Sequence, residues 1–332
     1  MDTIKISHGS GGQQSAGLIK NIILKYFGNP LLGRLEDAAM LENIPPKIAF
    51  TADSFVVEPI FFPGGNIGDL AVCGTVNDLA VRGAAPKYIS VSFIIEEGFL
   101  LTDFKKILAA MKARAKEAGV IIAAGDTKVV PRGKCDKIFI NTSGVGFMLK
   151  NASISAANIR AGDAVIVSGA LGEHSVAVMN ARHKLGIKAN LKTDSAPLNK
   201  ITTALIKTLG ADIKMMRDIT RGGLSSVLNE IAGKHIGFEL SEQKIPVSKA
   251  ARAAGALLGL DALDMANEGK FVAVVKASSA DKALQIIRAN KYGKDAQIIG
   301  RCVRGGKVSL ITPLGVKRVL RAPLGEVLPR IC

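Results

Sequence analysis

The chain has 332 residues, 48% of them hydrophobic, and a formal net charge of +16. This length accommodates about two domains with their own cores, and the composition is that of a folded protein rather than a disordered one. No apolar run reaches the length needed to span a bilayer, and the first residues lack the apolar core of a signal peptide. We therefore expect neither a membrane protein nor a secreted one.

The basic residues are dispersed along the chain, and only three tyrosines and no tryptophan accompany them. This pattern disfavours nucleic-acid binding, which uses basic grooves beside stacking aromatic rings. A small anionic substrate such as a nucleotide explains part of the charge equally well. The four cysteines, at positions 73, 135, 302 and 332, form no C-x-x-C pair. Their spacing argues against a zinc site and a disulfide framework and predicts a cytoplasmic protein.

A glycine-rich stretch, HGSGGQ, occupies positions 8–13, and apolar residues at helical spacing follow from 15 to 27. Dense glycines let consecutive backbone N–H groups converge on an anion, and a helix start behind them favours a phosphate. The stretch fits neither the dinucleotide fingerprint nor the Walker pattern. A flexible turn explains the glycines alone more simply.

Several apolar runs of the first half end in aspartate. Asp37 lies just before one such run, and a predicted strand over 48–52 leads into Asp53. A predicted helix over 67–79 carries Asp78, and a short buried strand over 120–124 should deliver the GDTK sequence at 125–128. Each aspartate alone is most simply a turn or cap residue. Four of them at the ends of elements indicate a carboxylate cluster that would bind magnesium beside a phosphate.

The second half begins after a change of composition over 151–160. It contains RDITRGGL at 217–224, which opens an amphipathic helix whose N-terminus favours an anion, and ANEGK at 266–270 before a strand over 271–275. Helices and strands alternate in both halves, so we expect two α+β domains. The predicted limits are 1–155 for the N-terminal domain, 156–320 for the C-terminal domain and 321–332 for a tail.

The tail ends in LPRIC at 328–332, and prolines at 313, 323 and 329 disfavour a helix there. A chain end without regular structure is mobile by default, so we expect few core contacts to depend on it. A mobile arm that ends in a thiol, Cys332, is suited to carry a chemical group. An unreactive terminal cysteine is the simpler alternative from the tail alone.

Five motifs recur here in a family order: HGSGG at 8–12, NDLA at 77–80, GDTK at 125–128, TRGGL at 220–224 after Asp218, and NEG at 267–269. Together they resemble the superfamily of aminoimidazole ribonucleotide synthetase, selenophosphate synthetase and thiamine-monophosphate kinase. The terminal PRIC at 329–332 narrows the resemblance to the HypE family of hydrogenase maturation factors, over essentially the whole chain. Ile219 stands where that family usually has proline, which puts the local turn geometry in doubt.

The resemblance implies an α+β aminoimidazole ribonucleotide synthetase-like fold in which N-terminal strands of a homodimer pair into a β-barrel. It implies that HypF loads a carbamoyl group onto Cys332 and that ATP then drives its dehydration to a thiocyanate. The cyanide would pass to a HypC–HypD complex. ATP and Mg²⁺ are the implied cofactors, and no membrane or nucleic acid is implied.

The resemblance also assigns site residues. Catalysis falls to Cys332, Lys128 and Glu268. The nucleotide falls to Gly9, Gly11, Gly12, Asp53, Asn77, Asp78, Asp126, Thr127, Arg221 and Gly222, and the metal to Asp37, Asp53, Asp78 and Asp126. Lys128 is alternatively a charge partner of phosphate, and Glu268 a structural salt bridge. Another superfamily enzyme such as selenophosphate synthetase, or a non-catalytic thiol carrier, stays open as an alternative function.

Overall fold

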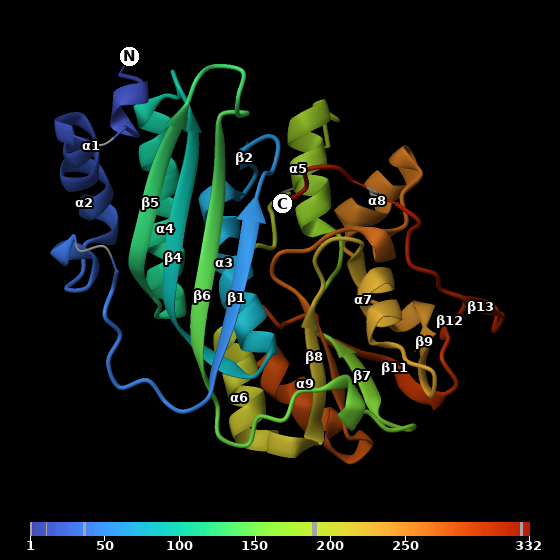
Figure 1. The fold of residues 1–332 in the computed structure, drawn as a ribbon. Coiled ribbons are helices and arrows are strands. Elements are labelled where there is room, and N and C mark those ends of the chain that lie inside the picture. Colours follow the sequence, from blue (N-terminus) through green and yellow to red (C-terminus); the bar gives the residue numbers. More distant parts are fainter. Residues whose placement is uncertain (1, 11, 36–37, 188–190, 326–327) are drawn as a thin grey trace.

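The computed structural model describes residues 2–10, 12–35, 38–187, 191–325 and 328–332. Figure 1 shows two parts side by side, each with helices packed on one sheet, and the C-terminus lying at their junction. This mixture of helices and strands confirms the predicted α+β class. The predicted change of domain near residue 155 falls between the last strand of the first sheet and the first strand of the second.

The N-terminal sheet has four strands in the order β1-β6-β4-β5. Their bounds are β1 (Ile48–Phe55), β6 (Ile138–Met148), β4 (Ala84–Glu96) and β5 (Ile121–Val130). Strand β6 pairs antiparallel with both β1 and β4, whereas β4 and β5 pair in parallel. Strands β1 and β5 are therefore the two edges of this sheet, on opposite sides of it.

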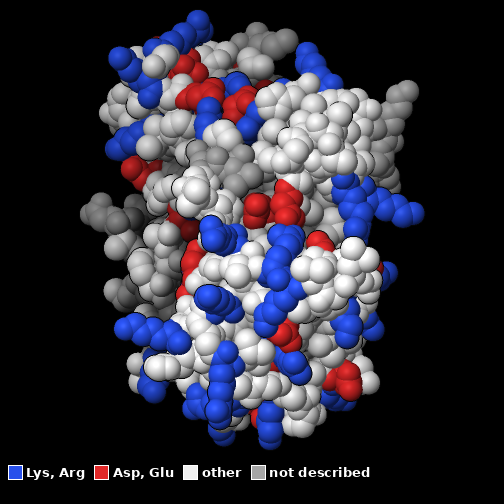
Figure 2. All heavy atoms as spheres, turned by 90° about the vertical axis from the view of Figure 1, so that its right-hand side faces the viewer, with Lys and Arg blue, Asp and Glu red and all other residues white. Residues whose placement is uncertain are grey.

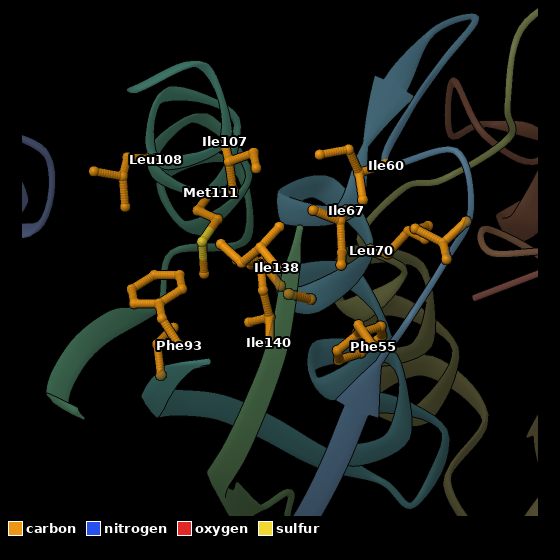
Figure 3. Packing of buried hydrophobic residues seen from close by; sticks show 14 of the residues in the cluster. Phe55, Ile60, Ile67, Leu70, Phe93, Ile107, Leu108, Met111, Ile138 and Ile140 are labelled. Carbon is orange, nitrogen blue, oxygen red and sulfur yellow. The ribbon is translucent and has the colours of Figure 1, made fainter. Parts of the chain in front are cut away.

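Two helices, α3 (Ile67–Val81) and α4 (Leu101–Ala118), cover one face of this sheet (Figure 1). A capping box starts α3, because Asn66 accepts the N–H of Gly68 and Asp69 accepts the N–H of Asn66. Helix α4 ends at Gly119, whose left-handed φ of 73° suits glycine. Apolar side chains of both helices meet those of the sheet in the first core (Figure 3). The predicted helix over 67–79 is confirmed.

The remaining N-terminal elements are short. They are α1 (Gly12–Leu18), a π-helical turn (Ile19–Ile23), α2 (Leu24–Phe27), β2 (Phe61–Phe62) and β3 (Gly65–Asn66). Short 3₁₀ turns occur in both parts of the molecule and span Ile6–His8, Leu32–Arg34, Ala156–Asn158, Gly210–Asp212, Glu242–Lys244, Ala262–Asp264 and Ala277–Ser279. The predicted helical stretch over 15–27 is confirmed, with a π turn in its middle.

The C-terminal sheet has seven strands in the order β13-β12-β9-β11-β7-β10-β8. Their bounds are β7 (Ala164–Val167), β8 (Ile213–Asp218), β9 (Ile236–Ser241), β10 (Phe271–Val275), β11 (Gln297–Arg304), β12 (Val308–Ile311) and β13 (Lys317–Val319). The helices are α5 (Glu173–His183), α6 (Asn199–Leu209), α7 (Gly223–Ile231), α8 (Lys249–Leu258) and α9 (Ala280–Arg288). Helices α6 and α9 share one apolar cluster with the sheet, and α7 shares another, so both faces are covered.

Two expectations are wrong in detail. The predicted strand over 120–124 is twice as long, because β5 follows β4 in parallel until Val130 pairs with Glu96, so residues 125–128 lie within the strand. The tail does contribute to the core: Leu328 and Ile331 are buried in the N-terminal cluster. Residues 326–327 of the predicted tail lie outside the described residues, and the mobility of the tail stays a prediction.

Lys and Arg side chains are scattered over the C-terminal face, with Asp and Glu between them (Figure 2). Among the described residues, no helix is both long enough and apolar enough to cross a membrane.

Candidate functional site

The C-terminal residues dock into the junction between the two parts. We call this junction, formed by residues 56–58, 194–196, 267–269 and 328–332, the seam. The backbone N–H of Val56 donates to the carbonyl of Cys332 at 3.3 Å, and that of Glu58 donates to the carbonyl of Arg330 at 3.1 Å. The tail thus lies alongside the chain that leaves β1, and its last residue is held through its backbone.

His174, at the start of α5, binds the tail from the C-terminal part. Its Nε2 lies 2.8 Å from the carbonyl oxygen of Ile331, so Nε2 carries the proton, and Nδ1 accepts from Thr193 at 2.8 Å. Burial lowers the pKa of His174, which keeps the ring neutral in this tautomer. A neutral, fully buried histidine therefore holds the residue that precedes Cys332.

Two arginines complete the docking. The guanidinium of Arg182 donates to the carbonyls of Pro329 and Arg330, both at 2.8 Å. Arg330 itself donates to the Asp136 carboxylate at 2.7 Å and to the Val56 carbonyl at 2.9 Å. Sequence reasoning missed His174, Arg182 and Asp136, because no motif marks them and each meets the tail across a long stretch of sequence.

The carboxyl group of Glu268 lies beside the Cys332 thiol. The Glu268 side chain is 3% exposed, and the Cys332 thiol lies close enough to its carboxyl group for each to shift the pKa of the other. Burial, reinforced by Asp194 and Asp218, raises the pKa of Glu268 well above its usual range. Within the described part of the chain, no cation lies within ion-pair distance of Glu268, so a structural salt bridge does not account for it.

The backbone around Glu268 is rigidly held. The Asp194 carboxylate accepts the N–H groups of Glu268 and Gly269 at 3.1 and 3.2 Å. The Asn77 amide donates to the carbonyls of Ala196 and Glu268, and its oxygen accepts from Leu198 at 2.8 Å. The described contacts of Asn77 therefore fasten the seam, although the resemblance assigns this residue to the nucleotide.

The thiol of Cys332 is neutral in this position. Burial raises its pKa, because the thiolate would lose its solvation, and Glu268 adds to the shift while Arg221 opposes it. A neutral thiol is a poor nucleophile. The docked position therefore suits a step that follows the loading of Cys332 better than the loading itself.

An acidic cavity of about 410 Å³ lies next to the seam, lined by Asp53, Asp78, Asp218 and Arg221 among others. Burial, followed by repulsion from Asp78, raises the pKa of Asp53 to about 6 and that of Asp218 to about 7. Thr51 donates to Asp78 at 2.7 Å, and Thr75 donates to Asp53 at 3.1 Å. Asp218 belongs to the quoted motif, yet sequence reasoning did not assign it to the site.

A second cavity of about 410 Å³, the glycine cavity, is lined by Gly9, Asp126, Thr127 and Lys128, among others. Its other walls are apolar residues of the first two helices and of β4 and β5. The predicted phosphate cradle and the GDTK sequence are thus brought together. Gly12 starts α1 nearby in sequence with a φ of 73°, whereas Gly11 lies outside the described residues.

The acidic cavity and the glycine cavity lie at opposite edges of the N-terminal sheet. Asp53 is on β1 and Asp126 on β5, which three strand spacings separate by about 14 Å. Lys128 is also on β5, 65% exposed and 3.8 Å from Asp126. One chain therefore brings Asp53 and Asp78 together but leaves Asp126 at the opposite edge, and Asp37 lies outside the described residues. In the ranges described here, no group of three or more His, Cys, Asp or Glu residues could hold a metal ion.

Two further motif residues have clear roles in the turn before α7. Gly222 precedes the helix with a left-handed φ of 74°. Ile219 donates its N–H to the carbonyl of Lys270 at 2.9 Å, and its own carbonyl accepts from Asn267. Proline at this position would lack that donor. The turn is therefore held here by a bond that the family's usual residue cannot make.

These features define the AIR synthase related class. Residues 35–148 match the family described as AIR synthase related protein, N-terminal domain, and residues 160–312 match its C-terminal domain. The chain is 45% identical to the carbamoyl dehydratase HypE of Escherichia coli K12, over 100% of both chains. It belongs to the HypE family of carbamoyl dehydratases and hydrogenase maturation proteins, as its motifs predicted.

Solved structures of HypE proteins are similar to this chain over most of its length. A crystal structure of hydrogenase maturation protein HypE in complex with ATP has a TM-score of 0.95 and 43% identity, covering 99% of this chain and 100% of that one. A HypE–HypF complex has a TM-score of 0.81 and 46% identity, covering 92% of this chain and 99% of that one.

Proposed function

We propose that this chain carries a carbamoyl group on Cys332 and uses ATP to dehydrate it to a thiocyanate, the source of a cyanide ligand for hydrogenase iron. The observation that carries the proposal is the docked terminal segment, which His174 and Val56 hold through its backbone so that the Cys332 thiol interacts with the buried Glu268 carboxyl beside an acidic cavity. The ATP-bound and HypF-bound relatives support a nucleotide and a carbamoyl donor of these kinds.

The chemistry needs both an activated oxygen and a proton acceptor. The oxygen of the thiocarboxamide is a poor leaving group until the γ-phosphoryl group of ATP is transferred to it. The C–O bond then breaks as the nitrogen loses its two protons, giving the nitrile. One proton leaves with hydrogen phosphate and one is released. Glu268, next to the sulfur, is positioned to take a proton from the nitrogen once its carboxyl group is ionised, and its raised pKa makes that carboxylate a stronger base.

Docking and loading are separate steps in this scheme. The neutral, enclosed thiol favours loading by HypF with the tail undocked, after which the loaded tail returns to the seam. Release of the tail would then present the cyanide to the HypC–HypD complex. The backbone contacts of His174 and Arg182 make no bond to the Cys332 side chain, so they serve a loaded and an unloaded tail alike.

The acidic residues fit magnesium by their chemistry. Carboxylate oxygens are the ligands magnesium prefers, and a cation would relieve the repulsion that raises the pKa values of Asp53 and Asp218. Asp53, Asp78 and Asp126 would hold it, together with Asp37 and the phosphates. Magnesium, when bound, would neutralise phosphate charge during transfer. Gly9, Gly12, Thr127, Arg221 and Gly222 would bind the nucleotide.

A homodimer would complete this site. The face of the N-terminal sheet that α3 and α4 leave uncovered exposes Ile48, Phe50 and Ile94, with Phe50 68% exposed. Burying such a face against a second copy would close a barrel and cover the edge strands. The β5 edge of one chain would then approach the β1 edge of its partner, which would bring Asp126 and Lys128 to the Asp53 side.

The mass of the C-terminal peptide tests the proposal. After incubation with HypF, carbamoyl phosphate and ATP, Cys332 should gain a carbamoyl group and then lose one water only when ATP is present. Cys332→Ala should abolish both changes, whereas Cys73→Ala, Cys135→Ala and Cys302→Ala should retain them. Modification at another cysteine, or water loss without ATP, would contradict the proposal. If Cys332 gains a carbamoyl group but never loses water, the chain is a thiol carrier and not a dehydratase.

A further inference from the structure

Two buried oxygens in the seam lack partners. Glu268 Oε1 and Ser195 Oγ are both inaccessible to solvent and have no hydrogen-bond partner among the described residues. Ser195 is 4% exposed. Buried polar atoms are nearly always paired with protein groups or with ordered water, so two such atoms in one place need an explanation.

Ser195 and Glu268 have one neighbour in common. The fully buried thiol of Cys73 interacts electrostatically with both residues, and a thiol is a weak hydrogen-bond partner for either oxygen. The backbones also run together: Ala196 donates to the Glu268 carbonyl at 3.4 Å, while Asp194 accepts from the Glu268 N–H at 3.1 Å. Ser195 lies between these two residues in sequence, so the chain on both sides of it is tied to the backbone of Glu268.

Ser195 also borders a third cavity, of about 390 Å³, to which Cys332 does not contribute. We call it the back cavity. Its lining includes Glu173, Asp194 and Lys270, and the Lys270 ammonium lies 3.3 Å from the Asp194 carboxylate and 3.6 Å from that of Glu173. Ser195 thus lines a polar cavity to which neither Glu268 nor Cys332 contributes, while its sequence neighbours are bonded to Glu268.

We propose that Ser195 and one ordered water form a proton path from Glu268 to the back cavity. The water would accept from or donate to both unpaired oxygens beside Cys73. The inference rests on the proposed function, in which one proton per turnover must leave an enclosed site. Glu268 takes that proton from nitrogen, passes it to the water and Ser195, and recovers its original state. No oxidant or further reactant is needed.

The first test is a high-resolution crystal structure of the full chain. A water within hydrogen-bond distance of both Ser195 Oγ and Glu268 Oε1 is expected, and its absence would overturn the proposal.

The second test is the single-turnover rate of ATP-dependent water loss from carbamoylated Cys332. Ser195→Ala should slow it about tenfold or more, with carbamoyl loading and ATP binding unchanged. Ser195→Thr, which keeps a hydroxyl, should restore most of the rate. Ser225→Ala is the matched control, because Ser225 is equally buried and its hydroxyl donates to the Leu263 carbonyl.

The outcomes separate the two proposals. If wild-type protein never loses water, the proposed function fails. If wild type reacts and Ser195→Ala reacts equally fast, the proton path fails and the function stands. If Ser195→Ala and Ser195→Thr are equally slow, the position matters for packing alone and the path is likewise overturned.

Discussion

The seam around Cys332 and the β5 edge around Asp126 carry residues of the same set of motifs. A single chain nevertheless buries and bonds the residues of the seam far more completely than those of the β5 edge. In the seam, Glu268, Leu328 and Ile331 are buried, and the terminal segment is held by bonds from both parts of the molecule. On β5, Asp126 and Lys128 are mostly exposed and have each other as an ion pair at 3.8 Å. The seam is complete within one chain, whereas in the proposed function the β5 edge is completed by the nucleotide and a second chain.

The largest effect expected from this difference is a complementation between subunits. Asp78→Ala and Asp126→Ala should each lower ATP-dependent dehydration by about two orders of magnitude or more, because uncovered phosphate charge opposes transfer. If each site takes Asp78 from one chain and Asp126 from the other, mixing the two variants should restore about one quarter of wild-type activity. No recovery on mixing would mean that each site lies within one chain.

The next prediction concerns the face of the N-terminal sheet that α3 and α4 leave uncovered. Phe50→Glu places a charge on the exposed apolar face, at its β1 edge, and should convert a homodimer to a monomer at micromolar concentration, as seen by light scattering. Activity should fall as the dimer dissociates, whereas the tail should stay docked in the seam. A matched control is Leu314→Glu, since Leu314 is also highly exposed but lies in the turn between β12 and β13. A dimer that survives Phe50→Glu would contradict the barrel arrangement.

Local patterns predicted the elements well because each element carries its own signals. The helix over 67–79, the strand over 271–275 and the turn before α7 are encoded by residues next to them in sequence. The order of strands in the sheet is not local. Nothing in the sequence near Asp53 or Asp126 says that their strands form opposite edges, so a list of motif residues looked like one cluster.

The docked tail was unpredictable for the same reason. Three prolines indicate an irregular segment, and this remains true, since 328–332 form neither helix nor strand. Its burial depends on His174 and Arg182, which lie about 150 residues away in sequence, and on two apolar side chains, Leu328 and Ile331. Two apolar residues are too weak a signal to distinguish a docked tail from a free one.

The stability of the folded chain should depend on pH through Asp218, which lines the acidic cavity. Asp218 has its pKa raised from 3.8 to about 7, so its ionisation destabilises the folded chain increasingly between these values. Asp218→Asn should therefore raise the free energy of unfolding above pH 7 by up to about 4 kcal/mol, and change it little near pH 4. Urea unfolding at both pH values measures it. An equal effect at both would contradict the assigned cause.

The smallest effect concerns how firmly the tail is held. Ile331 is 2% exposed, so Ile331→Ala should weaken docking by about 1–3 kcal/mol through lost burial. Leu324→Ala is the matched control in the same terminal segment, because Leu324 is fully exposed. Weaker docking should also free the thiol: alkylation of Cys332 should quicken about tenfold for each 1.4 kcal/mol lost, if it proceeds from the undocked state. An unchanged alkylation rate would show that the docked thiol is already accessible, and that the enclosure of Cys332 does not separate loading from dehydration.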